Sequence, residues 1–224
     1  MVHKKPVVLD FVGSHSTGKT TCINHVKVLL KRLGFLYKEV PSTSRTEADD
    51  MFPKDKLYHE VGDFLQAWIS MTNWANILES IHGYEFTLCT DLGVRSLAYT
   101  LSSPKTNTKT EIAHKKMVDF FNSPLFLSSV DVYRIYLPIE FDIVPDGIRT
   151  LDNDFHKHFD QNLRYIFKTC RIPVIQLSGS IDQRNQQLED LITRICTNRC
   201  TLEYKPGSLK PEARDCQTWE GECN

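Results

Sequence analysis

The sequence predicts an α/β fold, in which a mostly parallel five-stranded sheet carries helices on both of its faces. Short runs of β-branched and aromatic residues alternate with longer stretches whose apolar residues recur at helical spacing. The short runs are almost continuously apolar, which is typical of parallel strands that are buried on both sides. With 224 residues, of which 41% are hydrophobic, the chain can build one sizeable core.

The first half of the chain is predicted to form strands and helices in alternation, over residues 6–12, 19–33, 35–40, 61–82 and 85–90. The three strands read PVVLDFV, FLYKEV and EFTLCT, and are rich in residues that favour a sheet. The two helices carry apolar residues three and four positions apart. Gly34 and Gly83 follow these helices as natural stops, and Pro41 closes the second strand.

The second half continues the alternation, over residues 110–121, 130–137, 155–170, 173–177 and 182–197. The strands are VDVYRIYL and PVIQL, and the three other segments have the periodicity of helices. Residues 198–224 are polar, contain cysteines and lack periodicity. We therefore expect one domain over residues 1–197, followed by a tail at 198–224 that packs on the domain or lacks fixed structure.

The stretch GSHSTGKT, residues 13–20, matches the pattern G-x-x-x-x-G-K-[ST] in full. It follows a predicted buried strand and opens a predicted helix, which is the context that this phosphate-binding loop requires. Glycines let the backbone direct several N–H groups at one anion, and the helix N-terminus adds partial positive charge. The sequence therefore predicts a three-layer P-loop NTPase fold that binds ATP and Mg²⁺.

Two residues at the end of the loop have specific expected roles. Lys19 reaches the β- and γ-phosphates, and the Thr20 hydroxyl ligates Mg²⁺. The predicted nucleotide-binding residues are Gly13, Ser14, His15, Ser16, Thr17, Gly18, Lys19, Thr20 and Thr21.

Further candidates follow the ends of the predicted strands, where open α/β sheets bind their ligands. Asp91 is expected to hold the magnesium shell, with a helix cap as the alternative. Glu39 ends the second strand and is a candidate general base or a solvated charge. Arg45 and Arg95 are candidate clamps for a substrate phosphate or hydroxyl, with surface ion pairs as the alternative.

Aromatic and histidine side chains offer weaker signals. The helix at 61–82 carries Phe64, Trp68 and Trp74, which either line a pocket for a flat substrate ring or belong to the core. Trp68 is retained as a substrate-binding candidate. His156 and His158 are expected to be solvated.

Composition limits the partners. A net charge of −1 and a pI near 6.7 argue against a nucleic acid polymer, although a local basic patch stays open. No apolar run approaches the roughly 20 residues that span a bilayer, and no signal-peptide pattern is present, so we expect a cytoplasmic protein without a membrane partner. The last four cysteines, at 196, 200, 216 and 223, lack the paired spacing of a structural zinc site. Whether the chain forms a homodimer stays open.

The chain resembles the P-loop kinases of small nucleoside-type substrates, namely ribosylnicotinamide-kinase-like ATP-binding proteins, deoxynucleoside kinases and thymidylate-kinase-like enzymes. The resemblance spans residues 6–197. Beside the loop at 13–20, it depends on KEVPSTSR at 38–45, TDLGVRS at 90–96, and PIEFDIVPDGIRTLDNDFHKHFDQNL at 138–163.

The resemblance implies roles for several residues. The segment near 138–160 is similar to a lid over the phosphates, from which Arg149 would close onto the transferring phosphoryl group. The alternative is a structural Asp-Gly turn followed by an exposed arginine. Glu39 corresponds to the general base of deoxynucleoside kinases, but the match is EVP only. An acidic residue at the position of Asp91 takes the acceptor proton in related kinases.

Together these features predict a phosphotransferase with catalytic residues Lys19, Glu39, Asp91 and Arg149. It would transfer the γ-phosphoryl group of ATP to a nucleoside or nucleoside monophosphate. Two alternatives stay open. One is a kinase that acts on a hydroxymethylated base in DNA, and the other is a P-loop ATPase or a nucleotide-dependent regulatory binding module.

Overall fold

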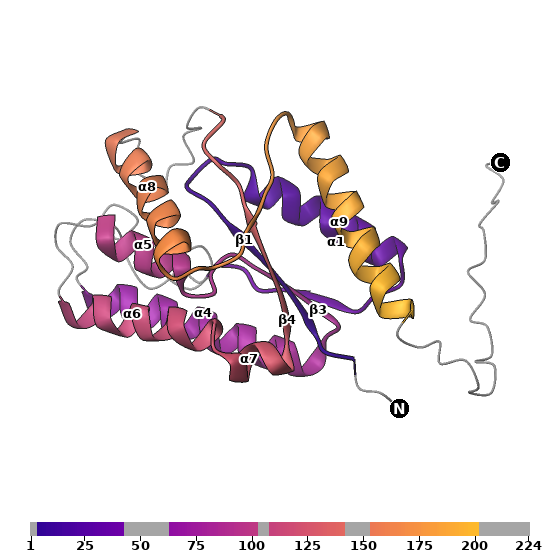
Figure 1. Ribbon diagram of the computed structural model, residues 1–224, viewed down its shortest axis with the longest axis horizontal. Helices are drawn as coiled ribbons and strands as arrows, with labels where there is room; N and C mark the ends of the chain where they lie inside the picture. Colours follow the sequence, from indigo (N-terminus) through magenta and orange to yellow (C-terminus); the bar gives the residue numbers. More distant parts are fainter. Residues whose placement is uncertain (1–3, 43–62, 103–107, 142–152, 202–224) are drawn as a thin grey trace.

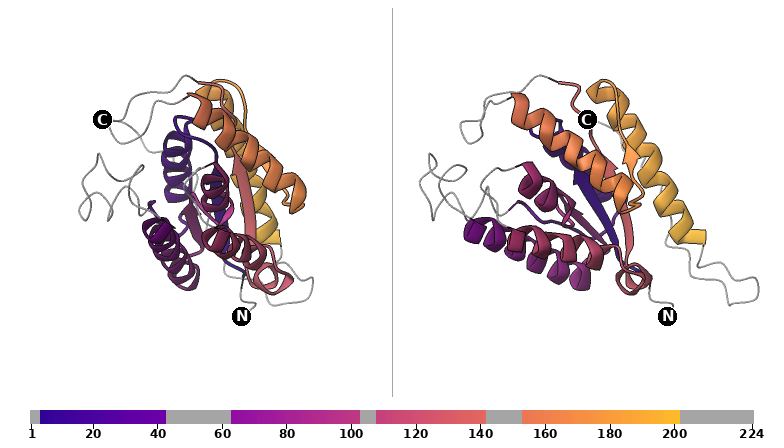
Figure 2. Two further views of the ribbon diagram at one scale, coloured as in Figure 1. Left: turned by 90° about the vertical axis from the view of Figure 1, so that its left-hand side faces the viewer. Right: turned by 60° about the vertical axis from the view of Figure 1, so that its left-hand side comes forward.

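The computed structural model describes residues 4–42, 63–102, 108–141 and 153–201. It confirms the predicted α/β fold: a five-stranded sheet, parallel at every pairing, carries helices on both faces (Figures 1 and 2). The strand order is β2-β3-β1-β4-β5. The strands are β1 Val7–Val12, β2 Tyr37–Glu39, β3 Phe86–Cys89, β4 Asp131–Tyr136 and β5 Ile175–Gln176.

Five of the helices correspond to predicted ones, and two, α5 and α7, were not predicted. The helices are α1 Lys19–Arg32, α4 Asp63–Gly83, α5 Val94–Ser102, α6 Thr108–Phe121, α7 Pro124–Ser129, α8 Asn153–Thr169 and α9 Ile181–Thr201. The helix α7 has a Ser123 cap and a proline in its first turn, but its six residues are too few to show periodicity. The helix α9 continues four residues beyond the predicted end at 197.

The two faces of the sheet bury different side chains of β1. Val7, Leu9 and Phe11 pack against α1 and α9, while Val8 and Val12 face the layer that contains α4 to α8. Figure 1 shows α1 and α9 together on one side of the sheet and the other helices across it. Burial on both faces explains why these strands are continuously apolar.

A buried polar row crosses the three central strands. Asp10 of β1 lies between Cys89 of β3 and Arg134 of β4, which are its partners in the parallel register. The Arg134 Nε atom lies 3.9 Å from the Asp10 carboxylate, and both side chains are almost fully buried. Burial raises the pKa of Asp10 to about 7, although Arg134 acts in the opposite direction.

The central position of β1 determines where a ligand can bind. The chain leaves β1 between β3 on one side and β4 on the other, and all three strands end at the same edge of the sheet. Such a point, where neighbouring connections diverge, is the usual binding crevice of an open parallel sheet. Among the described helices, none is long and apolar enough to cross a membrane.

Candidate phosphate-binding site

Gly13 begins the loop at the point where β1 meets the end of β4. A Cβ atom on Gly13 would lie 2.5 Å from the Leu137 carbonyl oxygen and 2.8 Å from the Thr17 hydroxyl. The Leu137 N–H also donates to the Val12 carbonyl at 2.8 Å, which holds the two strand ends together. Only glycine fits this close approach, so the first glycine of the pattern has a steric reason.

Gly18 ends the loop and caps α1. Its φ of 88° lies in the left-handed region, which a glycine adopts without strain. No side chain caps the helix at this residue, and the first turn of α1 carries no acidic residue. The first N–H groups of a helix have no intrahelical partner, so the start of α1 offers donors to an anion.

Lys19 lies folded over the loop that it follows. Its ammonium donates to the carbonyl oxygens of Gly13, at 2.9 Å, and of Ser14, and to the Thr17 hydroxyl at 3.3 Å. The charge is therefore held directly above the loop backbone. A phosphate that entered the loop would therefore lie near a positive charge.

Thr20 and Thr21 are exposed at the start of α1. Exposure of Thr20 fits a magnesium ligand, because magnesium at a nucleotide site binds few protein groups and completes its shell with phosphate oxygens and water. Within the described residues, no group of three or more His, Cys, Asp or Glu side chains could hold a metal ion by itself. The magnesium role of Thr20 stays a prediction.

Arg184 of α9 binds the backbone of the loop. Its guanidinium donates to the Thr17 carbonyl at 2.6 Å and to the Glu140 carboxylate at 2.7 Å, and it lies 4.6 Å from the centre of the Phe141 ring. Arg184 is 1% exposed, so this is a buried arginine at the floor of the loop. Glu140 also accepts from the Gly179 N–H at 2.7 Å, and Arg184 lowers the pKa of this carboxyl.

Asp91 lies at the carboxyl end of β3 and is 4% exposed. One oxygen accepts from the Ser96 N–H at 3.3 Å, and the other accepts from the Ser96 hydroxyl. Ser96 also shares a hydrogen bond of 2.8 Å with Ser70 of α4. These contacts match the helix-capping alternative, whereas the magnesium role of Asp91 gains no support from them.

Arg95 joins the ends of two strands. Its guanidinium donates to the Ser42 hydroxyl at 3.3 Å and to the Thr90 hydroxyl at 3.4 Å. Ser42 follows β2 and Thr90 follows β3, so Arg95 lies at the carboxyl edge of the sheet. Open parallel sheets bind their ligands at this edge, and the acceptor contact of Arg95 stays a prediction.

Glu39 does not lie with the loop. Its carboxylate pairs with the Lys27 ammonium at 2.6 Å, and both side chains are about one third exposed. Lys27 is eight residues beyond Lys19, or about 12 Å further along α1. The structure therefore gives the base role predicted for Glu39 no support and shows a half-exposed ion pair instead.

The other predicted residues divide into two groups. Arg45 and Arg149 lie outside the described residues, as do residues 142–152 of the lid predicted near 138–160. Trp68 is half-buried on α4, whereas Trp74 belongs to the core and packs edge-on against His114 and Phe121. The pocket role of Trp68 stays a prediction.

Two residues that contact the loop were not predicted from the sequence. His156 was expected to be solvated, but it is 4% exposed and its Nδ1 atom lies 2.6 Å from the Ser14 hydroxyl. Its spacing of three and seven from Phe159 and Leu163 places it on the apolar face of α8, and this signal was available in the sequence. The role of Arg184 had no sequence signal, because it depends on a contact across 167 residues.

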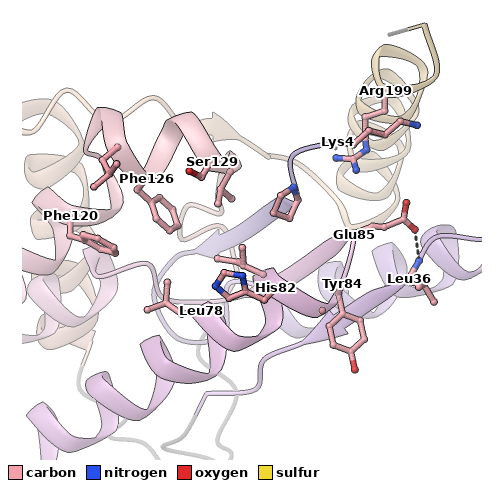
Figure 3. A pocket seen from close by; sticks show the side chains of 15 residues that line it. Lys4, Leu36, Leu78, His82, Tyr84, Glu85, Phe120, Phe126, Ser129 and Arg199 are labelled. Atoms are coloured by element: carbon pink, nitrogen blue, oxygen red, sulfur yellow. Dashed lines mark hydrogen bonds between the residues drawn. The ribbon is translucent and has the colours of Figure 1, made fainter. Parts of the chain in front are cut away.

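A separate pocket of about 660 Å³ lies at the opposite edge of the sheet (Figure 3). Its lining includes Pro6, Glu85 and Val130, which precede β1, β3 and β4, together with Phe126 of α7 and Arg199 of α9. Parallel sheets bind their ligands at the carboxyl ends of the strands. The loop, and not this pocket, therefore lies at the edge of the sheet where the predicted nucleotide site is expected.

Comparison with known proteins supports the fold. No protein-family model matches the sequence, and no curated protein matches it significantly. Among the solved structures that match is thymidylate kinase from Candida albicans, with a TM-score of 0.54 and 17% identity. The similarity covers 87% of this chain and 92% of that chain. At this identity it shows a shared P-loop NTPase fold, while the finer resemblance to ribosylnicotinamide-kinase-like proteins stays a prediction.

Proposed function

We propose that this chain is an ATP- and Mg²⁺-dependent kinase that transfers the γ-phosphoryl group to a nucleoside-type small molecule, either a nucleoside or a nucleoside monophosphate. The phosphate loop carries the proposal. Its first glycine has no room for a side chain, its last glycine caps α1 in the left-handed region, and it lies where the connections from β1 diverge. A structural neighbour named thymidylate kinase is consistent with nucleotide kinase chemistry on this fold.

On the ATP side, the loop amides and the start of α1 would hold the phosphates. Lys19 would exchange its contacts with the loop carbonyls for contacts with phosphate oxygens, because these carry more negative charge. Thr20 would hold magnesium, and the bound ion would offset the charge that develops on the transferring group. Arg149 would approach from the predicted lid.

On the acceptor side, Arg95 would bind a phosphate or hydroxyl of the acceptor at the carboxyl edge of the sheet. Arg45 and Trp68 stay candidates for the same pocket. Of the two candidate bases, Asp91 lies at this edge and Glu39 is paired with Lys27. A carboxylate that accepts two hydrogen bonds retains lone pairs for a third, so Asp91 can orient the acceptor hydroxyl.

The test measures ADP release from ATP and magnesium with a panel of nucleosides, nucleoside monophosphates and duplex DNA that carries a hydroxymethylated base. We expect turnover that depends on one small acceptor. Slow release that no acceptor alters would instead support an ATPase or a regulatory module, and release that depends on the modified DNA would support the DNA-kinase alternative.

Replacement of Lys19 by alanine tests whether the loop takes part in phosphoryl transfer. We expect turnover to fall at least roughly a hundredfold, because the ammonium stabilises the charge of the transferring phosphoryl group. Lys31→Ala, which alters an exposed lysine on the same helix, should keep wild-type turnover. Wild-type rates in Lys19→Ala, with an unchanged melting temperature, would refute the assignment of the loop.

A further inference from the structure

A hydrogen bond joins the phosphate loop to α8. The Ser14 hydroxyl and the His156 Nδ1 atom are 2.6 Å apart and come from residues 142 positions apart in the chain. Ser14 is 1% exposed and His156 is 4% exposed, so water does not compete for this bond. The loop and α8 are therefore connected by a hydrogen bond in a buried environment, where such a bond is strong.

Aromatic rings hold the imidazole in place. The His15 ring lies parallel to the His156 ring, with centroids 6.3 Å apart, and at 6.2 Å from the Phe159 ring. Tyr99 of α5 packs edge-on against Phe159 at 6.5 Å. The His156 Nε2 atom is buried without a hydrogen-bond partner within the described part of the chain. The ring is therefore fixed by packing and by Ser14.

Burial and two nearby charged groups, one of them on the loop, shift the pKa of His156. Burial is the largest cause that lowers its pKa, the Lys19 ammonium lowers it further, and Asp160 on α8 acts in the opposite direction. Asp160 itself accepts from the Tyr136 hydroxyl at 2.6 Å and from Arg164 at 2.8 Å, so part of its charge is already compensated. Burial and the nearby Lys19 ammonium therefore both favour the neutral imidazole.

We infer that His156 is a positioning residue that couples filling of the phosphate loop to α8, and that it takes up a proton when a triphosphate binds. Entry of the phosphates draws the Lys19 ammonium toward them and adds negative charge beside the imidazole. Both changes favour the protonated ring. This inference rests on the proposed function only in assigning a triphosphate to the loop.

The bond to Ser14 can persist in both protonation states. In the neutral state the Ser14 hydroxyl donates to Nδ1, with the imidazole proton on Nε2. After proton uptake, the Nδ1–H donates to the Ser14 oxygen. A donor that carries charge strengthens the bond, so triphosphate binding would tighten the connection between the loop and α8.

The experiment is calorimetry with magnesium and a non-hydrolysable ATP analogue near pH 7, in buffers of different ionisation enthalpy. We expect wild-type protein to take up a fraction of one proton per analogue bound. His156→Asn retains a polar atom near the Nδ1 position but cannot titrate, so uptake should vanish. His158→Asn, which alters an exposed histidine on the same helix, should keep it.

A second set of variants tests the coupling itself. Ser14→Ala and His156→Phe should each weaken analogue binding by roughly threefold to tenfold, since each removes one buried hydrogen bond. The variant that carries both substitutions should have about the same affinity for the analogue as the single variant with the lower affinity. Both substitutions remove the same hydrogen bond, so their effects should not add. Multiplicative losses would overturn the coupling, and undiminished proton uptake in His156→Asn would overturn the titration.

Two further readouts keep the outcomes distinct. Nuclear magnetic resonance titration of the wild-type His156 ring, with and without the analogue, needs no variant, and a pKa that the analogue does not raise would overturn the inference. Analogue binding with the expected uptake but without phosphoryl transfer would refute only the proposed function. Kinase turnover without uptake linked to His156 would refute only the inference, and the absence of any triphosphate binding would refute both.

Discussion

Replacement of Arg184 by methionine tests whether the phosphate loop depends on support from α9. The wild-type guanidinium donates at 2.6 Å to the Thr17 carbonyl inside the loop and at 2.7 Å to Glu140. It also packs on the Phe141 ring at 4.6 Å. Methionine has a comparable length and fills most of the space, but it can donate no hydrogen bond.

The expected cost follows from these contacts. Loss of the donor to the buried Thr17 carbonyl costs about 1–3 kcal/mol. Glu140 is 31% exposed and keeps the Gly179 N–H, so loss of its partner costs less than about 1 kcal/mol after solvent screening. The contact with Phe141 adds roughly 1 kcal/mol. The sum is about 2–5 kcal/mol, or a melting temperature lower by roughly 4–20 °C for a chain of this size.

Thermal and urea unfolding measure this change, and calorimetry measures the accompanying loss of ATP affinity. Arg194→Met is the matched control, because Arg194 is exposed on the same helix. We expect its stability to stay within about 0.5 kcal/mol of wild type. If Arg184→Met melted within 1–2 °C of wild type and bound ATP normally, the loop would not need this support and our reasoning would be wrong.

Three other predictions concern the loop, the predicted base and the core. Gly13→Ala should abolish measurable ATP binding in calorimetry, because the added Cβ would meet the Leu137 carbonyl at 2.5 Å; wild-type affinity would contradict this steric reason. Glu39→Gln should leave kcat within about twofold and cost at most about 1 kcal/mol of stability, since it alters a half-exposed pair with Lys27; a hundredfold loss of kcat would restore Glu39 as the base. Folding raises the pKa of Asp10 from 3.8 to about 7, so between these values the folded protein keeps a proton that the unfolded chain loses. Wild-type stability relative to Asp10→Asn should therefore fall as the pH rises from 4 to 7, by roughly 4 kcal/mol from about three pKa units at 1.4 kcal/mol each. Urea unfolding at both pH values checks this, and a constant difference would count against it.

Local sequence patterns were sufficient to predict the elements whose structure depends mainly on their own residues. The strand PVVLDFV became β1, and the periodic residues after it became α1. The first glycine of the loop has a steric reason and the second has a conformational one. Short elements were harder to predict. The helix α5 spans nine residues and α7 spans six, too few for periodicity to separate them from loops.

The roles of the strand-end carboxylates depended on their neighbours. Asp91 and Glu39 both follow strands, and the sequence offered each a functional and a structural alternative. The structure pairs Glu39 with Lys27 and binds both oxygens of Asp91 to Ser96. A side chain at the end of a strand can turn toward either layer, and only packing selects the direction.

By itself, the sequence determined the alternation of strands and helices and the phosphate loop between the first of each, because these depend on residues close together in the chain. The tertiary structure decided the strand order, the burial of His156 against Ser14, and the support of the loop by Arg184. These contacts join residues more than 140 positions apart, and their partners come together only when α8 and α9 pack on opposite faces of the finished sheet.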